Sequence, residues 1–300
     1  MTTHKNKVGL VGIGDMGSGL AKNLLEKGFD VYGFDLDPVR MDAFTAMGGT
    51  KAPDLAAVAD KSRAVFVMVM TGNQAKQVIF SENGLADNLP PGSVVILTAT
   101  IKPAEAAEIH DGLVSRGLSL IDSPVSGGFP GGQSGMLTMM AAGSNANMES
   151  CSDIMQAVSK TIHHVGEAAP KGQIVKACLQ SLIGSVFSAT FEASVLAAKA
   201  GIPGQTLFDV FSTSGAGCGV ANTALENIID RQFEGTGSHI ATMHKDLTIS
   251  LAFAEDLGVP MHTAATAMQL FHAGKTKYPD GDNWVVTRVL EEIVSAELHR

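Results

Sequence analysis

A glycine pattern stands directly behind a short apolar run near the start of the sequence. Gly12, Gly14 and Gly17 follow the order G-x-G-x-x-G, after the β-prone residues 7–11 and before leucines at helical spacing. The hydrophobic period changes from two to 3.6 across the glycines, which is typical of a strand that turns sharply into a helix. In such a turn the first glycine permits the bend, the second lets a diphosphate approach the backbone, and the third lets helix and strand pack closely. The pattern predicts a dinucleotide-binding turn, with a plain glycine-rich turn as the alternative.

An acidic residue ends the second expected strand. Asp35 closes the stretch VYGFD, about 20 residues beyond the glycines, where a carboxylate accepts hydrogen bonds from a ribose diol and repels a 2′-phosphate. The alternative role for Asp35 is a solvated strand end or a helix cap before Pro38. Arg40 is near enough to accommodate a 2′-phosphate. Together these residues favour NAD over NADP.

Strand-like and helix-like patterns alternate through the first half of the chain. An amphipathic helix is expected at 103–115 and another helical segment at 146–159. Such alternation predicts an α/β domain of the Rossmann type with a mainly parallel sheet. The expected strands are 8–11, 31–34, 65–70, 94–97, 119–121, 136–141 and 162–165.

The second half of the chain has a different pattern. From Gly172 onward the period of two disappears, and one long apolar helix reaches about Ala200. We therefore expect a dinucleotide-binding domain at 1–166 and an all-α domain at 167–300, joined by a long interdomain helix. Further helices, punctuated by glycine and proline, are expected at 205–212, 222–230, 239–257, 261–271 and 283–298.

Composition excludes several classes of partner. The formal net charge is −9 and no run of Lys or Arg forms a basic cluster, which argues against nucleic acid and anionic membranes as partners. The three cysteines are scattered without metal-ligand spacing, which favours a reducing compartment, and the histidines offer no ligand set. The opening residues MTTHKNK leave no room for an apolar signal segment. We expect a soluble cytoplasmic protein, without a metal, that acts on a small molecule.

Two later stretches contain candidate substrate-binding residues. The loop DSPVSGG at 122–128 offers hydroxyl and backbone N–H donors suited to a carboxylate, although a glycine-rich loop that only turns the chain fits equally. Lys176 stands in an apolar helical segment and shares a helix face with Gln180 and Gly184. Its side chain either reaches water or is held against a cleft. A lysine held out of water could exchange a proton with an alcohol that is being oxidised.

These stretches, in this order, resemble the β-hydroxyacid dehydrogenase family, which includes 3-hydroxyisobutyrate dehydrogenase, tartronate semialdehyde reductase and, more distantly, 6-phosphogluconate dehydrogenase. The resemblance spans nearly the whole chain. It is carried by GLVGIGDMGSGLAKNLL, by DSPVSGG with a following GMLTMM, by GQIVK, and by HKDL at 244–247.

The resemblance implies a Rossmann domain joined by a long helix to an all-α domain, and assembly as a homodimer or homotetramer. It also implies hydride transfer between a small hydroxy acid and NAD, with Lys176 as general acid and base. The implied substrate-binding residues are Ser123, Ser126, Gly127, Gly128 and Gln180. The implied cofactor-binding residues are Gly12, Gly14, Asp15, Met16, Gly17, Asp35, Met70, Thr100 and Lys245.

Departures from the family pattern bear on the substrate. Gln180 replaces the usual asparagine, and the approach GEAAPKGQ is one residue longer than in the isobutyrate enzymes. Both features resemble the L-threonate dehydrogenase branch, which oxidises four-carbon sugar acids. Cys218 and Gly219 stand where many relatives carry serine and tryptophan, and Ala99 replaces a serine, so a different hydroxy acid remains open. The alternatives are an NADPH-dependent semialdehyde reductase and a noncatalytic dinucleotide-binding protein.

Overall fold

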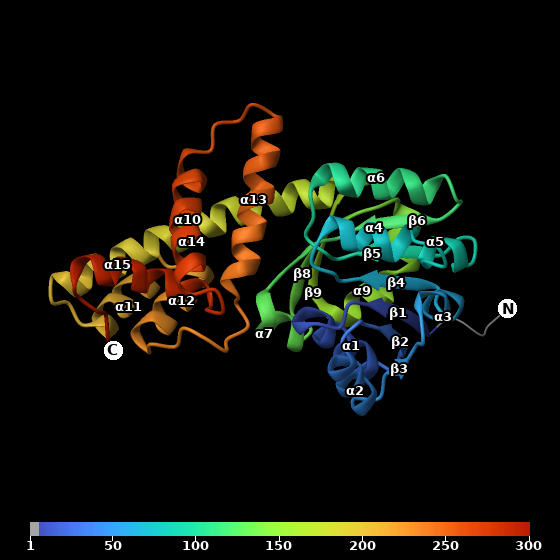
Figure 1. The fold of residues 1–300 in the computed structure, drawn as a ribbon, viewed down its shortest axis with the longest axis horizontal. Helices are drawn as coiled ribbons and strands as arrows, with labels where there is room; N and C mark the ends of the chain where they lie inside the picture. Colours follow the sequence, from blue (N-terminus) through green and yellow to red (C-terminus); the bar gives the residue numbers. More distant parts are fainter. Residues whose placement is uncertain (1–5) are drawn as a thin grey trace. The chain divides into compact units, whose positions relative to one another are not determined.

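The structure is a computed structural model that describes residues 6–300 (Figure 1). The chain separates into two compact units, the first ending at Lys176 and the second beginning at Ala177. The expectation about a signal segment falls mainly on residues 1–5, outside the described range.

The first unit contains one extended sheet. Its strand order is β3-β2-β1-β4-β5-β6-β8-β7, with β9 paired to β8. The strands from β1 to β6 pair in parallel, and β8 runs antiparallel to β6 and β7, so the prediction of a mainly parallel sheet is confirmed. The strands are β1 (Lys7–Val11), β2 (Asp30–Phe34), β3 (Thr50–Lys51), β4 (Ala64–Val67), β5 (Val94–Leu97), β6 (Ser119–Asp122), β7 (Val125–Ser126), β8 (Leu137–Ala142) and β9 (Ser159–Gly166).

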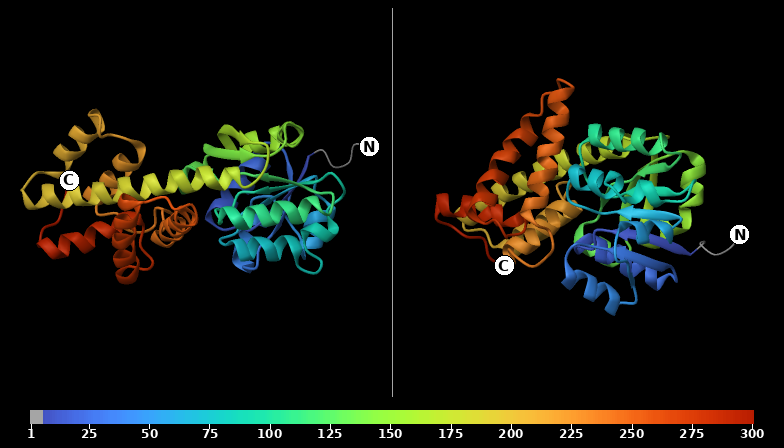
Figure 2. Two further views of the ribbon diagram at one scale, coloured as in Figure 1. Left: turned by 90° about the horizontal axis from the view of Figure 1, so that it is seen from above. Right: turned by 45° about the vertical axis from the view of Figure 1, so that its right-hand side comes forward.

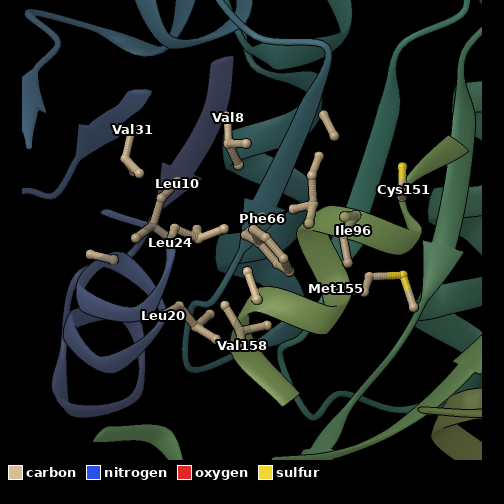
Figure 3. Close-up of a cluster of buried hydrophobic side chains, with 14 of the residues drawn as sticks. Val8, Leu10, Leu20, Leu24, Val31, Phe66, Ile96, Cys151, Met155 and Val158 are labelled. Carbon is tan, nitrogen blue, oxygen red and sulfur yellow. The ribbon is translucent and has the colours of Figure 1, made fainter. Parts of the chain in front are cut away.

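Helices cover both faces of this sheet, which explains why its central strands are apolar throughout. Around Phe66 of β4, side chains of one face pack against Leu20 and Leu24 of one helix and Met155 and Val158 of another (Figure 3). A second cluster lies on the opposite face. The helices of the first unit are α1 (Asp15–Glu26), α2 (Pro38–Ala46), α3 (Leu55–Asp60), α4 (Gly72–Phe80), α5 (Leu85–Asn88), α6 (Pro103–Val114), α7 (Gly128–Gln133), α8 (Asn145–Ser150) and α9 (Ser152–Val158).

The second unit is helical. The long helix α10 (Lys171–Lys199) begins in the first unit and continues into the second, where the later helices gather around it (Figure 2). The helix α10 is long and apolar enough to cross a membrane, but the buried core helix of a soluble protein meets the same criteria of length and composition. Its Phe187 and Phe191 lie in the core of the second unit, beside Phe271. The other helices are α11 (Gly204–Thr213), α12 (Gly219–Ile229), α13 (Ile240–Asp256), α14 (His262–Lys277), η1 (Asn283–Val285) and α15 (Val286–Val294).

Several expected boundaries are wrong. The strand expected at 65–70 ends at Val67, because Gln74 Oε1 accepts hydrogen bonds from the N–H groups of Met70 and Thr71 and so turns this backbone into the cap of α4. The helix expected at 146–159 breaks at Cys151 into α8 and α9. The short elements β3, β7 and α7 had no sequence signal of their own.

Candidate functional site

The glycine turn lies where the strand order reverses, between β1 and β4. Gly12 has φ +89°, and a Cβ there would collide with the carbonyl oxygen of Met68. A Cβ on Gly17 would collide with the carbonyl oxygen of Gly12, so helix and turn are in direct contact. At Gly14, by contrast, the nearest atom to an added Cβ would be Arg40 Nη1, at 3.6 Å. The three glycines thus meet the separate needs of a dinucleotide-binding turn, and α1 begins next to them, so its N-terminus is placed where a diphosphate can bind.

Asp35 lies beside this turn at the end of β2. Its Oδ2 accepts a hydrogen bond from the Ile13 N–H at 2.6 Å, and its Oδ1 accepts one from the Asp37 N–H at 2.9 Å. Arg40 Nη1 lies 3.8 Å from the same carboxylate. The helix-capping role belongs to Asp37, which accepts a hydrogen bond from Val39, and so the capping alternative for Asp35 is wrong. The carboxylate of Asp35 is oriented by the turn that it borders.

The other expected cofactor residues of the first unit follow the strand ends or lie on α1. Met70 is about half exposed after β4, and Thr100 lies in the loop after β5. Asp15 and Met16 form the first turn of α1, where the Asp15 carbonyl accepts a hydrogen bond from Gln133 Nε2 of α7 at 3.2 Å. This contact links α1 to the end of α7, the helix that follows the expected substrate loop.

The expected substrate loop follows β6. Ser123 is fully buried, and its Oγ has no hydrogen-bond partner among the described residues. Ser126 is partly exposed in β7, opposite Thr138 of β8. Gly127 and Gly128 have φ values of +132° and +60°, so glycine is needed where the chain turns into α7. The loop is therefore short, and its backbone is set by pairing with β8 on one side and by a helical turn on the other.

Lys176 is buried on α10 and contacts this loop. Its Nζ donates a hydrogen bond of 2.8 Å to the carbonyl oxygen of Val125, between Ser123 and Ser126 in the chain. Of the two alternatives for this lysine, burial excludes the one in which the ammonium extends into water. Its amine lies against the expected substrate loop, within one unit of the molecule.

A buried pair that the sequence analysis did not assign lies next to these groups. Gln173 Nε2 donates a hydrogen bond of 2.8 Å to Asp122 Oδ1, and the Gln173 backbone N–H donates one of 3.1 Å to Asp122 Oδ2. Burial raises the pKa of Asp122 to about 6, against the opposing effect of the bonds from Gln173 and from the Gly172 N–H. Both residues stand inside the motifs DSPVSGG and GQIVK, but nothing in the sequence shows that they meet.

The remaining candidates lie in the second unit. Gln180 Nε2 donates a hydrogen bond of 2.5 Å to Asp246 Oδ2, and Lys245 Nζ lies 3.0 Å from Asp246 Oδ1. Asp246 is buried and thus joins Gln180 on α10 to Lys245 on α13. Cys218 is exposed at the N-cap of α12, and a Cβ on Gly219 would meet no atom within 4 Å.

Across residues 6–300, no group of three or more His, Cys, Asp and Glu side chains is arranged to hold a metal ion. His244 and His272 do meet, with Nε2 and Nδ1 2.8 Å apart. Burial and the neighbouring Lys275 lower the pKa of His244.

Comparisons with known proteins agree with this architecture. The family model described as the NAD binding domain of 6-phosphogluconate dehydrogenase matches residues 7–166. A second model, described as NAD-binding of NADP-dependent 3-hydroxyisobutyrate dehydrogenase, matches residues 170–290. The L-threonate dehydrogenase of Escherichia coli O6:H1 (strain CFT073) is 33% identical over 288 residues, which cover 95% of this chain and 95% of that protein.

Solved structures are similar over nearly the whole chain. The crystal structure of 3-hydroxyisobutyrate dehydrogenase from Salmonella typhimurium is 30% identical, with a TM-score of 0.86, and the match covers 94% of this chain and 99% of that one. The 3-hydroxyisobutyrate dehydrogenase of Mycobacterium tuberculosis with L-serine is 25% identical, with a TM-score of 0.85, and the match covers 95% and 99% of the two chains.

Proposed function

Because this chain belongs to the β-hydroxyacid dehydrogenase family, which includes 3-hydroxyisobutyrate dehydrogenase, we propose that it oxidises a small hydroxy acid with NAD and uses Lys176 as the general base. Membership of the family makes it a dehydrogenase with a nicotinamide dinucleotide cofactor. The choice of NAD, the acid and the role of Lys176 are the proposed parts. The observation that carries the role of Lys176 is the hydrogen bond from its Nζ to the Val125 carbonyl, inside DSPVSGG.

The glycine turn fits a dinucleotide. Gly12 and Gly17 have no room for a Cβ, whereas a Cβ on Gly14 would have only the Arg40 guanidinium within 4 Å, so the backbone there can admit a diphosphate. Asp35 supports NAD over NADP, because its carboxylate can accept the ribose hydroxyls and would repel a 2′-phosphate. When bound, the nicotinamide supplies the acceptor for the hydride.

The chain's own residues supply binding and proton transfer. N–H and O–H groups of Ser123 to Gly128 hold the substrate carboxylate, and the neutral amine of Lys176 takes the proton of the substrate hydroxyl. The hydrogen on the hydroxyl-bearing carbon leaves as hydride with the electron pair of its C–H bond, the electron pair of the O–H bond forms the second carbon–oxygen bond, and a ketone or aldehyde results. In the reverse reaction the ammonium of Lys176 returns the proton. A role for Gln180 at the substrate and for Lys245 at the cofactor belongs to the same proposal.

A four-carbon sugar acid such as L-threonate is the first substrate to test. Support comes from Gln180 and from the E. coli relative named for that acid. Cys218 and Gly219 stand where many relatives carry serine and tryptophan, so the proposal also includes small hydroxy acids other than L-threonate. We also propose a cytoplasmic location and a homodimer or homotetramer.

The test is an initial-rate assay across C3 to C6 hydroxy acids, including L-threonate and D-3-hydroxyisobutyrate, with NAD and then NADP. Wild type and Lys176→Ala are compared, and NADH binding shows that the variant is folded. Turnover of one acid with NAD, lost in the variant, supports the proposal. Activity that does not depend on Lys176 contradicts the mechanism, and reduction of a semialdehyde with NADPH alone favours the other enzyme of the family.

A further inference from the structure

The side chain of Gln173 connects three segments that are far apart in the sequence. Its Nε2 donates to the Ala99 carbonyl at 3.0 Å and to Asp122 Oδ1 at 2.8 Å, and its Oε1 accepts from the Ile101 N–H at 3.1 Å. Both amide hydrogens and the amide oxygen are thus engaged. The side chain is 1% exposed and Asp122 is fully buried, so water does not compete for these bonds.

The same pair anchors the beginning of α10. The carboxylate of Asp122 accepts the backbone N–H of Gln173 at 3.1 Å and also bonds the N–H of Gly172. A Cβ on Gly172 would collide with the carbonyl oxygen of Asp122. The first turn of α10 therefore lies directly on the end of β6, and a negative charge stands where the dipole of a long helix favours it.

The positions of two residues of the proposed reaction depend on these contacts of Gln173 and Asp122. Lys176 lies one helical turn after Gln173, so any movement of the first turn of α10 moves its Nζ relative to the Val125 carbonyl. Thr100, expected at the nicotinamide ribose, stands between Ala99 and Ile101, whose backbone groups both bind Gln173.

We propose that Gln173 is a positioning residue, which holds the proton-transferring lysine and the cofactor loop in one fixed geometry through its bonds to Ala99, Ile101 and Asp122. This inference rests on the proposed function of Lys176 and Thr100. Gln173 is buried among these segments and acts through them. Because reaction rates depend steeply on the relative placement of the reacting groups, loosening this contact lowers kcat more than it lowers binding.

The test variant is Gln173→Met, which keeps the length and volume of the side chain and removes all three side-chain hydrogen bonds. We expect kcat to fall by about tenfold to a hundredfold, with the Kd for NADH changed by less than about threefold. The matched control is Leu113→Ala, which opens a cavity in the core at the far end of α6. It should lower the melting temperature at least as much and leave kcat within about twofold of wild type.

Hydrogen exchange provides a readout that does not depend on turnover. Relative to the other core peptides of the first unit in the same variant, the peptides that cover 99–103 and 171–177 should exchange faster in Gln173→Met but not in Leu113→Ala. If Gln173→Met does not fold, Gln173→Leu replaces it, because this smaller apolar side chain also removes all three side-chain hydrogen bonds and places no charge beside Asp122.

Two results would overturn the inference: a wild-type kcat in the folded Gln173 variant, or unchanged exchange in both peptides. Failure of the proposed function would give a result that differs from both of these. In that case the wild-type protein oxidises none of the acids, and the exchange experiment alone decides whether Gln173 holds the two segments together.

Discussion

Lys176 Nζ and the carbonyl oxygen of Val125 are joined by a hydrogen bond of 2.8 Å, out of contact with bulk water. A backbone carbonyl accepts from an ammonium and from a neutral amine alike, because both carry N–H donors. The contact can therefore persist while the nitrogen gains and loses a proton. This is what a group that alternates between acid and base requires.

Lys176→Arg should abolish most of the activity although it keeps the positive charge. A guanidinium does not lose its proton in the accessible pH range and so cannot act as the base. We expect kcat for the best acid to fall by about a hundredfold to ten-thousandfold, with NADH affinity retained. Steady-state rates and NADH titration measure the two effects. Lys171→Arg, at the exposed first residue of α10, is the matched control and should keep its activity; full activity in Lys176→Arg would remove the lysine from the mechanism.

Alanine substitutions at two glycines of the cofactor turn should have different consequences: Gly12→Ala should destabilise the fold, and Gly14→Ala should weaken NADH binding. Gly12→Ala forces a side chain onto a residue with φ +89° and into the Met68 carbonyl, so we expect a loss of unfolding free energy of about 3 kcal/mol or more. Gly14 has φ −74°, and the atom nearest to a Cβ added there, Arg40 Nη1, would be 3.6 Å away. Gly14→Ala should therefore stay within about 1 kcal/mol of wild type but lose about tenfold or more in NADH affinity.

Denaturant unfolding and NADH titration of both variants check this pair. The matched substitution at two positions of one turn separates damage to the fold from damage to the diphosphate site. A stable Gly14→Ala variant with wild-type NADH affinity would show that the dinucleotide does not approach the backbone there.

The parts of the fold that could be predicted are those with a repeating local pattern. The buried runs AVFV in β4 and VVIL in β5 identify strands covered on both faces, and the glycine turn marks the start of α1. The strand β7 and helix α7 could not be predicted, because two residues and a glycine-rich turn have no periodicity. The strand β7 forms because Val125 pairs with Met139 across the sheet, and α7 follows it after Gly127.

The same limit applies to the site. The position of Asp35 beside the glycine turn could be predicted, because its distance from the glycines follows from the length of one strand–helix–strand unit. The contacts of Gln173 with Asp122 and of Gln180 with Asp246 join residues 51 and 66 positions apart. No local pattern encodes such contacts, since they depend on which elements become neighbours in the folded chain.

Asp35→Ser should shift the cofactor preference toward NADP. The substitution removes the charge that repels a 2′-phosphate and releases Arg40, now 3.8 Å from that carboxylate, to bind one. We expect the ratio of kcat/KM for NADP to that for NAD to rise by about tenfold to a hundredfold. Asp54→Ser, which retains an N-cap side chain on α3, is the control and should leave the ratio unchanged. An unchanged ratio in Asp35→Ser would mean that Asp35 does not select the cofactor.

The buried carboxyl of Asp122 should make stability depend on pH. Its pKa is about 6 in the folded protein, above the ordinary value of 3.8, chiefly because burial disfavours the charged form. Between these two values the folded state binds the proton and the unfolded state does not. The contribution of this group to stability is therefore complete below pH 3.8 and is lost as the pH rises through 6. A difference of roughly two pKa units sets its size at about 3 kcal/mol at most.

Asp122→Asn isolates this contribution, because asparagine does not titrate. The free energy of unfolding of wild type minus that of the variant should fall as the pH rises from 4 to 7, and should level off above pH 7. Asparagine also presents an N–H₂ group toward donors of Gln173, so the variant should be less stable than wild type at pH 4, where the carboxyl of wild type is protonated. Denaturant unfolding at several pH values measures both effects. A difference that stays constant with pH would contradict a raised pKa at Asp122 and leave the carboxylate as an ordinary charged cap of α10.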